Sequence, residues 1–385
     1  MAENTLLSQR THIGIFGKTN SGKSSLINAL TSQSVSIVSD VAGTTTDPVM
    51  KTMELLPLGP VAIYDTPGLD DFSELGEKRI KRTKNILSNC HIALIVMSVL
   101  DEKDKTEEEV IKICKEKNIP FIEVYNKCDL KNIETDILKV SAKTGENIDK
   151  LKELLGSLKK EKETFFLGDT IKENDSYILV TPIDESAPKG RIILPQQQIL
   201  REILDNKAYA TVVQPKQLKS VLENLKDKPK LVITDSQAFK EVSQIVPKDI
   251  ELTSFSILFA RKKGNLEQSV NGANTLDTIN DGDKILISEG CTHHRQCNDI
   301  GTVKLPNLIR KYTGKQPEFV YTSGKEFPDD LSAYKLVIHC GGCMLTDKEV
   351  ENRYKSALEK GIPMTNYGIA IAKMNGILER TTKMF

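Results

Sequence analysis

The stretch T-H-I-G-I-F-G-K-T-N-S-G-K-S, at residues 11–24, decides the fold of the first part of the chain. Its apolar opening predicts a short buried strand, and an apolar helical pattern follows the glycine-rich loop. A strand, the loop G-x-x-x-x-G-K-S and a helix together predict a P-loop, in which backbone N–H groups surround phosphate groups. We expect Lys23 to contact the β- and γ-phosphates and Ser24 to bind Mg²⁺.

The composition is that of an ordinary globular protein. A chain of 385 residues exceeds the size of one hydrophobic core, so two or three domains are expected. Lys+Arg and Asp+Glu both number 53, which argues against nucleic acid or a membrane surface as a partner. No apolar run approaches the roughly 20 residues of a membrane span. Seven cysteines at irregular spacing and a polar start favour a cytoplasmic protein without disulfides or a secretory signal.

Three further motifs predict that the nucleotide is GTP. D-T-P-G at 65–68 follows an apolar strand pattern, which suits a Mg²⁺-linked carboxylate beside a γ-phosphate sensor. N-K-C-D at 126–129 ends another strand pattern, and Asp129 is placed to accept two hydrogen bonds that guanine offers and adenine does not. S-A-K at 141–143 matches the loop that closes over the base in GTPases.

Over about residues 10–160 these motifs resemble the translation-factor-related GTPases. G-T-T-T-D at 43–47 narrows the resemblance to the tRNA-modification and Era-like branch, and it implies that Thr45 binds Mg²⁺ when the triphosphate is present. The usual arginine after the two threonines is Thr46 here. Leu69 stands where Ras-like proteins carry a water-orienting glutamine, so slow hydrolysis is expected. Asn20 matches an asparagine that helps to bind K⁺ in this branch, so we expect K⁺-stimulated GTP hydrolysis.

The expected site residues of the GTPase fall into two groups. Contacts to GTP, Mg²⁺ or K⁺ are expected from Gly17, Asn20, Ser21, Gly22, Lys23, Ser24, Ser25, Thr45, Asp65, Asn126, Lys127, Asp129, Ser141, Ala142 and Lys143. Catalytic roles are expected for Lys23, Thr45, Asp65 and Gly68.

The remainder of the chain predicts two further domains. A polar run at 159–163 follows the last helix pattern of the GTP-binding domain, which we place at 1–165. Short strand and helix patterns then alternate through 170–252 without a cysteine or histidine, so we expect a parallel-sheet domain that serves in dimerisation. A third domain is expected at 253–385. The predicted fold class is α/β, with an N-terminal P-loop GTPase fold and two smaller domains with mainly parallel sheets.

A cysteine and histidine set lies in the third domain. Cys291 follows a strand pattern at 285–287, and Cys340 ends another at 335–339. If both strands belong to one parallel sheet, their carboxyl ends meet at one edge. The thiols of Cys291 and Cys340 would then lie close to that of Cys343, beside the start of the following helix. On spacing alone the set fits a structural zinc site, a [4Fe–4S] cluster with one exchangeable iron or, less completely, a redox pair.

C-x-H followed by H-C-x-x-C, on a chain that opens with this GTPase domain, resembles the [FeFe]-hydrogenase maturation GTPases, the HydF family, over the whole chain. The resemblance implies a GTP-binding, a dimerisation and an iron–sulfur domain, with a [4Fe–4S] cluster on Cys291, Cys340 and Cys343. It implies a homodimeric scaffold or carrier, which receives a diiron precursor from two radical-SAM maturases and delivers it to the apo-hydrogenase. GTP is then expected to act as a switch that gates association with the maturases.

Two questions stay open on the sequence. His293, His339, Asp184 and water are candidates for the fourth cluster ligand, and the two histidines are equally suited to hydrogen-bonding around the cluster. The alternative function is that of an Era-like, RNA-directed GTPase with a structural zinc domain. The balanced charge counts against that alternative.

Overall fold

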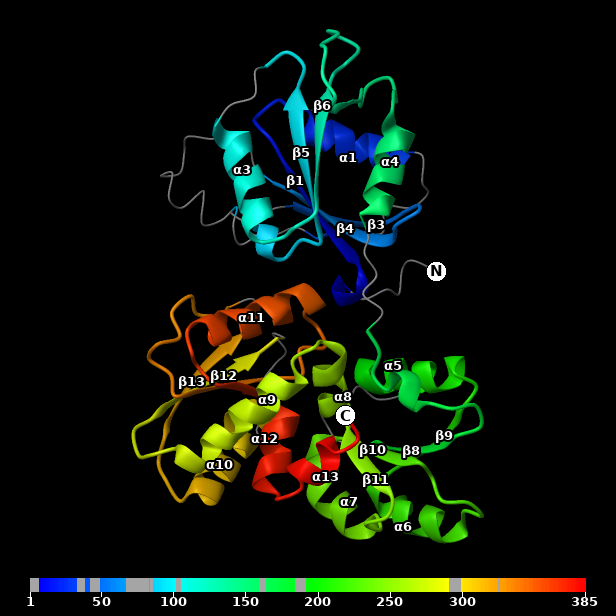
Figure 1. Cartoon of the computed structure of the whole chain (residues 1–385), viewed down its shortest axis with the longest axis vertical. Helices are drawn as coiled ribbons and strands as arrows, with labels where there is room; N and C mark the ends of the chain where they lie inside the picture. Colours follow the sequence, from blue (N-terminus) through cyan, green and yellow to red (C-terminus); the bar gives the residue numbers. More distant parts are fainter. Residues whose placement is uncertain are drawn as a thin grey trace. The chain divides into compact units, whose positions relative to one another are not determined.

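The computed structural model describes residues 7–32, 39–41, 49–66, 83, 86–101, 105–158, 164–183, 192–290, 299–324 and 326–385. The chain divides into two compact units, Met1–Lys162 and Glu163–Phe385, and each is described by itself (Figure 1). Within the described ranges no helix is long and apolar enough to cross a membrane.

The first unit is built on a seven-stranded sheet with the order β2-β3-β4-β1-β5-β6-β7. The pairs β2–β3 and β3–β4 are antiparallel. The pairs β4–β1, β1–β5, β5–β6 and β6–β7 are parallel. The strands are β1 (Thr11–Phe16), β2 (Ser39–Val41), β3 (Val49–Leu55), β4 (Gly59–Asp65), β5 (Ile92–Ser98), β6 (Phe121–Asn126) and β7 (Leu138–Lys139). The helices are η2 (Leu7–Gln9), α1 (Lys23–Ser32), α3 (Lys105–Glu116) and α4 (Ile148–Ser157). Apolar side chains of α1 and α4 pack on one face of the sheet and those of α3 on the other.

The second unit contains two four-stranded parallel sheets. The middle sheet has the order β11-β10-β8-β9. Its strands are β8 (Ser176–Val180), β9 (Tyr209–Val213), β10 (Leu231–Thr234) and β11 (Glu251–Ser254). The helices around it are η3 (Gly168–Thr170), α5 (Leu194–Asp205), α6 (Pro215–Asn224), η4 (Ser236–Ala238), α7 (Phe239–Ile245) and α8 (Phe255–Lys262). Alternate residues of the strands face α5 and α8 on one side and α6 and α7 on the other.

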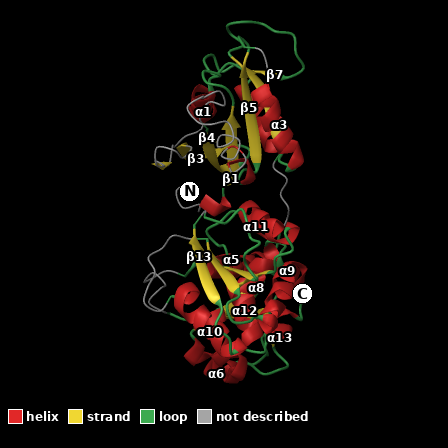
Figure 2. Cartoon of the chain, turned by 90° about the vertical axis from the view of Figure 1, so that its left-hand side faces the viewer, coloured by secondary structure: helices red, strands yellow, loops and turns green. Residues whose placement is uncertain are grey.

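The C-terminal sheet has the order β13-β12-β14-β15. Its strands are β12 (Lys284–Glu289), β13 (Glu318–Ser323), β14 (Leu336–His339) and β15 (Met364–Asn366). The helices around it are α9 (Leu266–Ala273), η5 (Asn274–Thr278), η6 (Ile300–Lys304), α10 (Leu305–Thr313), α11 (Asp347–Glu359), α12 (Tyr367–Met374) and α13 (Leu378–Thr382). α9, α10 and α12 cover one face and α11 covers the other, so helices flank the strands on both sides (Figure 2).

The middle and C-terminal sheets have the same topology. In each, the first strand lies between the second and the third, and the fourth lies outside the third. The register agrees as well. Val232 of β10 pairs with Ile178 and Leu252, and Val337 of β14 pairs with Leu286 and Met364 at the corresponding places.

Short sequence matches accompany this shared topology. K-L-V-I at 230–233 leads into β10 and recurs at 335–338, leading into β14. K-E-V at 240–242 in α7 recurs at 348–350 in α11, and α5 and α10 both begin with Leu-Pro. α8 and α12 are each followed closely by a glycine with positive φ, Gly264 (+73°) and Gly376 (+67°). The two domains are therefore versions of one α/β unit that occurs twice in the chain.

The predicted fold class is confirmed by these three sheets. The structure differs from the expected boundary between residues 252 and 253, because β11 continues through Ser254 as the outer strand of the middle sheet. The helix that follows, α8, contributes side chains to the cores of both domains. Phe255, Leu258 and Phe259 pack in the core of the middle sheet, whereas Ile257 and Ala260 pack in that of the C-terminal sheet.

Candidate nucleotide site and thiol site

The phosphate loop runs from the end of β1 into α1 and requires glycine at two places. Gly17 has φ +157°, and a Cβ there would lie 2.2 Å from the carbonyl oxygen of Val96. Gly22 has φ +89°, and a Cβ there would lie 2.3 Å from Nδ2 of Asn126. Glycine at both positions therefore lets the loop pack closely against β5 and Asn126 with a positive φ.

Lys23 and Ser24 begin α1 at the floor of this loop. The Nζ of Lys23 donates to the carbonyl oxygens of Gly17 at 2.9 Å and Lys18 at 2.7 Å, so the ammonium reaches back across the loop. Ser24 Oγ donates to Oδ2 of Asp65, at the end of β4, at 2.8 Å. The two oxygen groups expected to bind Mg²⁺ therefore converge from separate elements.

The loops expected to bind the base are connected to the phosphate loop through Asn126. Its Nδ2 donates to the carbonyl oxygen of Ser21 at 3.1 Å, and its Oδ1 accepts from the N–H of Ala142 at 3.0 Å. Ser141 Oγ donates to Oδ1 of Asp129 at 2.6 Å. N-K-C-D, S-A-K and the P-loop thus form one hydrogen-bonded group.

The other predicted nucleotide contacts lie on the same segments. Asn20 and Lys127 both have positive φ, +61° and +66°, in the loops that follow β1 and β6. Ser25 and Lys143 are exposed, on α1 and in the turn after β7. Predicted site residues outside the described residues are Thr45, Gly68, Asp184, Cys291 and His293.

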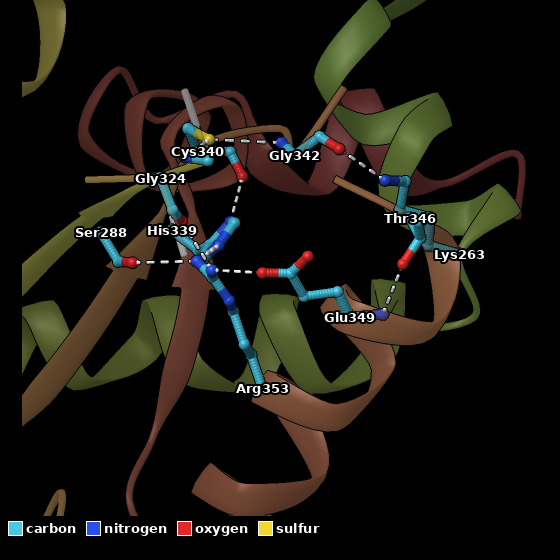
Figure 3. Close-up of polar contacts among 10 residues, drawn as sticks. Lys263, Ser288, Gly324, His339, Cys340, Gly342, Thr346, Glu349 and Arg353 are labelled. Carbon is cyan, nitrogen blue, oxygen red and sulfur yellow. Dashed lines mark hydrogen bonds and ion pairs between the residues drawn. The ribbon is translucent and has the colours of Figure 1, made fainter. Parts of the chain in front are cut away.

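Cys340 lies at the carboxyl edge of the C-terminal sheet, where β12 and β14 are parallel neighbours. Its Sγ accepts the N–H of Gly290 at 3.0 Å. It also accepts the N–H of Gly342 at 3.3 Å (Figure 3). Burial raises the pKa of the Cys340 thiol above its ordinary value, and these two N–H groups offset only part of the rise. Since Gly290 directly precedes Cys291 in the sequence, the chain enters that segment beside the Cys340 sulfur.

Cys343 lies three residues further on, just before α11. Burial raises the pKa of its thiol above the ordinary value, and the nearby Lys263 ammonium offsets only part of the rise. Thr346 caps α11 by accepting the N–H of Glu349 at 3.1 Å, so the positive end of the helix dipole lies near this loop. Cys340 and Cys343 are the described part of the predicted thiol set, and the described residues contain no group of three or more potential metal ligands.

Both ring nitrogens of His339 are engaged. Nε2 accepts from Arg353 at 3.0 Å and Nδ1 lies 2.6 Å from the carbonyl oxygen of Cys340, which assigns the proton to Nδ1 (Figure 3). Burial and the Arg353 charge lower the pKa of His339 to about 3, so the imidazole is neutral. In this arrangement His339 supports the loop of Cys340 and has no lone pair free for a metal.

Arg353 joins four elements beneath the thiol loop. It donates to the carbonyl oxygen of Gly324 and to Glu349, both at 2.7 Å, and to Ser288 Oγ at 3.4 Å (Figure 3). With His339, these contacts link the ends of β12, β13 and β14 to α11. The fixed N–H donors and the neutral imidazole suit a thiolate-bound metal group, because hydrogen bonds to sulfur and second-layer donors are what stabilise such groups.

Three models of known families match the chain, and together they include both candidate sites. The hydrogen maturase F dimerization domain matches residues 166–264, and the hydrogen maturase F tetramerization domain matches residues 267–384. The 50S ribosome-binding GTPase family matches residues 12–127. The chain belongs to the hydrogen maturase F family.

The two curated relatives described next resemble the GTPase region of this chain. The tRNA modification GTPase MnmE of Legionella pneumophila (strain Paris) is 36% identical over 160 residues, which cover 40% of this chain and 35% of MnmE. GTPase Der of Mycoplasmopsis agalactiae is 32% identical over 175 residues, covering 39% of this chain and 40% of Der. The chain therefore spans well under half the length of these relatives.

Solved structures also match at a low level. Translation elongation factor SelB of Methanococcus maripaludis, in complex with a GTP analogue, has a TM-score of 0.32 and 22% identity, over 46% of this chain and 39% of SelB. The G domain of the T. maritima FeoB iron transporter has a TM-score of 0.32 and 21% identity, over 39% of this chain and 99% of that domain. With TM-scores below 0.5, these two matches carry no weight here.

The matched models describe the parts of the chain. They are a GTPase domain followed by a dimerization domain and a tetramerization domain of the hydrogen maturase F family. The sequence patterns predicted one oligomerisation domain, whereas the family comparison names two. They also missed Arg353 and Lys263. The only local signal for Arg353 is its i, i+4 spacing from Glu349, which is common on helix surfaces.

Proposed function

We propose that this protein holds a [4Fe–4S] cluster on Cys291, Cys340 and Cys343 and carries a diiron precursor to apo-[FeFe]-hydrogenase. The observation that carries the proposal is the hydrogen bond from the Gly290 N–H to the Cys340 sulfur. Through this bond the residue that directly precedes Cys291 in the sequence contacts the sulfur of Cys340. Three thiolates leave one iron with an exchangeable position, which is the property that a transient carrier needs.

The residues around the thiols have separate roles in this proposal. Two backbone N–H groups stabilise the Cys340 thiolate, and His339 with Arg353 fixes the backbone at Cys340. The fourth position then belongs to water, His293 or Asp184, or to the precursor itself, which is the cargo. The precursor would come from radical-SAM maturases and leave for the apo-hydrogenase.

The GTPase is proposed to act as a switch. Thr45 would bind Mg²⁺ and the γ-phosphate while GTP is present and release them after hydrolysis, which changes the surface offered to the maturases. Leu69 in place of a water-orienting glutamine suits slow hydrolysis, and Asn20 suits stimulation by K⁺. A hydrolysis rate that is equal in Na⁺ and K⁺ would remove the K⁺ part of this proposal.

The carrier role is tested by activation of apo-hydrogenase. Full-length protein, produced with or without the radical-SAM maturases, is purified anaerobically and mixed with apo-hydrogenase, and hydrogen evolution is measured. We expect activation only by wild-type protein produced with the maturases, and none by Cys340→Ala. Equal activation by protein produced without them would contradict the carrier role.

The switch role is tested in the same assay with Lys23→Ala. This variant loses an ammonium that is expected to contact the phosphates, so we expect activation to fall at least about tenfold. Iron content is the control, because the change lies outside the thiol-bearing unit. Activation at the wild-type rate, with GTP hydrolysis abolished, would show that nucleotide hydrolysis is not needed for delivery.

A further inference from the structure

Lys263 approaches the thiol loop from outside the cysteine-bearing strands. It is the residue that caps the C-terminus of α8, the helix whose buried side chains divide between the middle and C-terminal cores. Its Nζ donates to the carbonyl oxygen of Gly342 at 2.7 Å, within the turn that joins Cys340 to Cys343 (Figure 3).

The positive charge of Lys263 is buried with incomplete compensation. Its side chain is 4% exposed, and the nearest carboxylate, that of Asp347, lies 3.6 Å away and is itself 58% exposed. The ring of Phe259 lies 5.9 Å from Nζ on another side. A buried ammonium is costly unless close anions balance it, and one solvated carboxylate is a weak counter-charge. Burial lowers the pKa of Lys263, and among the described residues Asp347 and the thiols of Cys343 and Cys340 oppose this shift.

We propose that Lys263 is a positioning residue of the metal centre, which holds the turn at Gly342 and supplies a counter-charge to the thiolates of Cys340 and Cys343. The proposal rests on the proposed function of this site. A fixed positive charge stabilises the more negative of two redox states, so Lys263 favours the reduced cluster over the oxidised one. Because α8 also belongs to the core of the middle sheet, the middle domain takes part in tuning the centre.

Three substitutions separate the charge from the hydrogen bond. Lys263→Met removes both, Lys263→Gln removes the charge but keeps an N–H donor, and Lys263→Arg keeps both. Lys262→Met is the matched control: it removes one positive charge from the adjacent residue, whose Nζ lies over the Phe166 ring at 4.4 Å. If Lys263→Met fails to fold, Lys263→Gln carries the test of the charge.

The first measurement is the midpoint potential of the cluster in full-length, anaerobically reconstituted protein, followed by EPR. For Lys263→Met and Lys263→Gln we expect the ratio of reduced to oxidised cluster at the wild-type midpoint to fall about tenfold, which is about 59 mV for a one-electron couple. Lys263→Arg and Lys262→Met should stay within about threefold of wild type. An unchanged potential in Lys263→Gln, or an equal shift in Lys262→Met, would overturn the assigned charge effect.

The second measurement is amide hydrogen exchange of a peptide covering 340–346 in cluster-free protein. We expect exchange to be about tenfold faster in Lys263→Met and close to wild type in Lys263→Gln, because only the first loses the donor to Gly342. Unchanged exchange in Lys263→Met would overturn the positioning role. A wild-type protein that binds no iron would instead refute the proposed function, and a cluster-loaded wild type with unresponsive variants would refute only the role of Lys263.

Discussion

The middle and C-terminal sheets share strand order and register, yet their strand ends carry different chemistry. Where the C-terminal sheet has Ser288, His339 and Cys340, the middle sheet has Val180, Thr234 and Asp235 at the corresponding positions. The scaffold that brings two strand ends together is therefore common to both domains. The thiol site depends on a few residues that differ between the two sheets, at the carboxyl edge of the C-terminal sheet.

The difference continues beneath the strand ends. Counting from the shared K-E-V, Arg353 of α11 corresponds to Ile245 of α7. Ile245 packs against an apolar cluster, whereas Arg353 binds His339, Glu349 and two strand ends. An apolar contact stabilises a domain without fixing backbone groups, but a network of directed hydrogen bonds holds them in place. The polar network thus lies in the copy that carries the proposed thiol site.

The largest difference between the copies is expected at Cys340 and Asp235. Cys340→Ala should lower iron and sulfide content more than tenfold after anaerobic reconstitution, because two thiolates do not retain the cluster. Asp235→Ala removes a cap, whose Oδ1 accepts the Gln237 N–H at 3.0 Å, and should cost about 1 kcal/mol of unfolding free energy with iron content unchanged. Full iron content in Cys340→Ala would mean that Cys340 is no more important for iron binding than Asp235, which would contradict this difference.

A second difference is expected between Arg353 and Ile245. Arg353→Met leaves the Glu349 carboxylate without its cation and should lower the unfolding free energy by about 3–5 kcal/mol. Ile245→Ala, at a half-buried position, should cost about 1–2 kcal/mol. Urea denaturation of both variants measures the two losses, with Glu349→Gln as a control that keeps the side-chain shape. Equal losses would mean that the polar network is no stronger than the apolar contact.

The smallest difference is expected between the helix caps Ser254 and Asn366. Ser254 Oγ accepts the N–H of Ile257 at 3.3 Å, and Oδ1 of Asn366 accepts that of Ile369 at 2.8 Å. Each replacement by alanine should cost about 1 kcal/mol. Each side chain also makes a second hydrogen bond: Asn366 Nδ2 donates to the carbonyl oxygen of Ser256 at 3.2 Å, and Ser254 Oγ accepts from Ser236 Oγ at 3.4 Å. Asn366→Ala should therefore cost about 0.5 kcal/mol more than Ser254→Ala, because both of its hydrogen bonds are shorter. A greater loss in Ser254→Ala would reverse this order.

The parts that the sequence predicted are those whose signal is local or follows from a general rule. The P-loop is a continuous motif, and its glycines are required by contacts that the structure contains. The closeness of the ends of β12 and β14 follows from parallel strands meeting at one edge. The roles of the individual site residues remain predictions, including those of Thr45, Gly68, Asp184, Cys291 and His293, which lie outside the described residues.

The parts that were missed are contacts between distant or ordinary-looking residues. Lys263 is 79 residues from Gly342, and nothing in its neighbourhood marks it as different from Lys262. The contacts of Arg353 to Ser288 and Gly324 span 65 and 29 residues. The shared topology was hidden because the matching stretches, K-L-V-I and K-E-V, are too short to stand out before the strands are placed.

The most direct test of the thiol site is anaerobic analysis of iron, sulfide and zinc in the full-length wild-type protein, with EPR after reduction by dithionite. We expect about four iron and four sulfide per chain and a reduced-cluster signal. About one zinc per chain, with no cluster signal even after reconstitution, would contradict it. That result would favour a GTPase whose C-terminal thiols hold a structural metal.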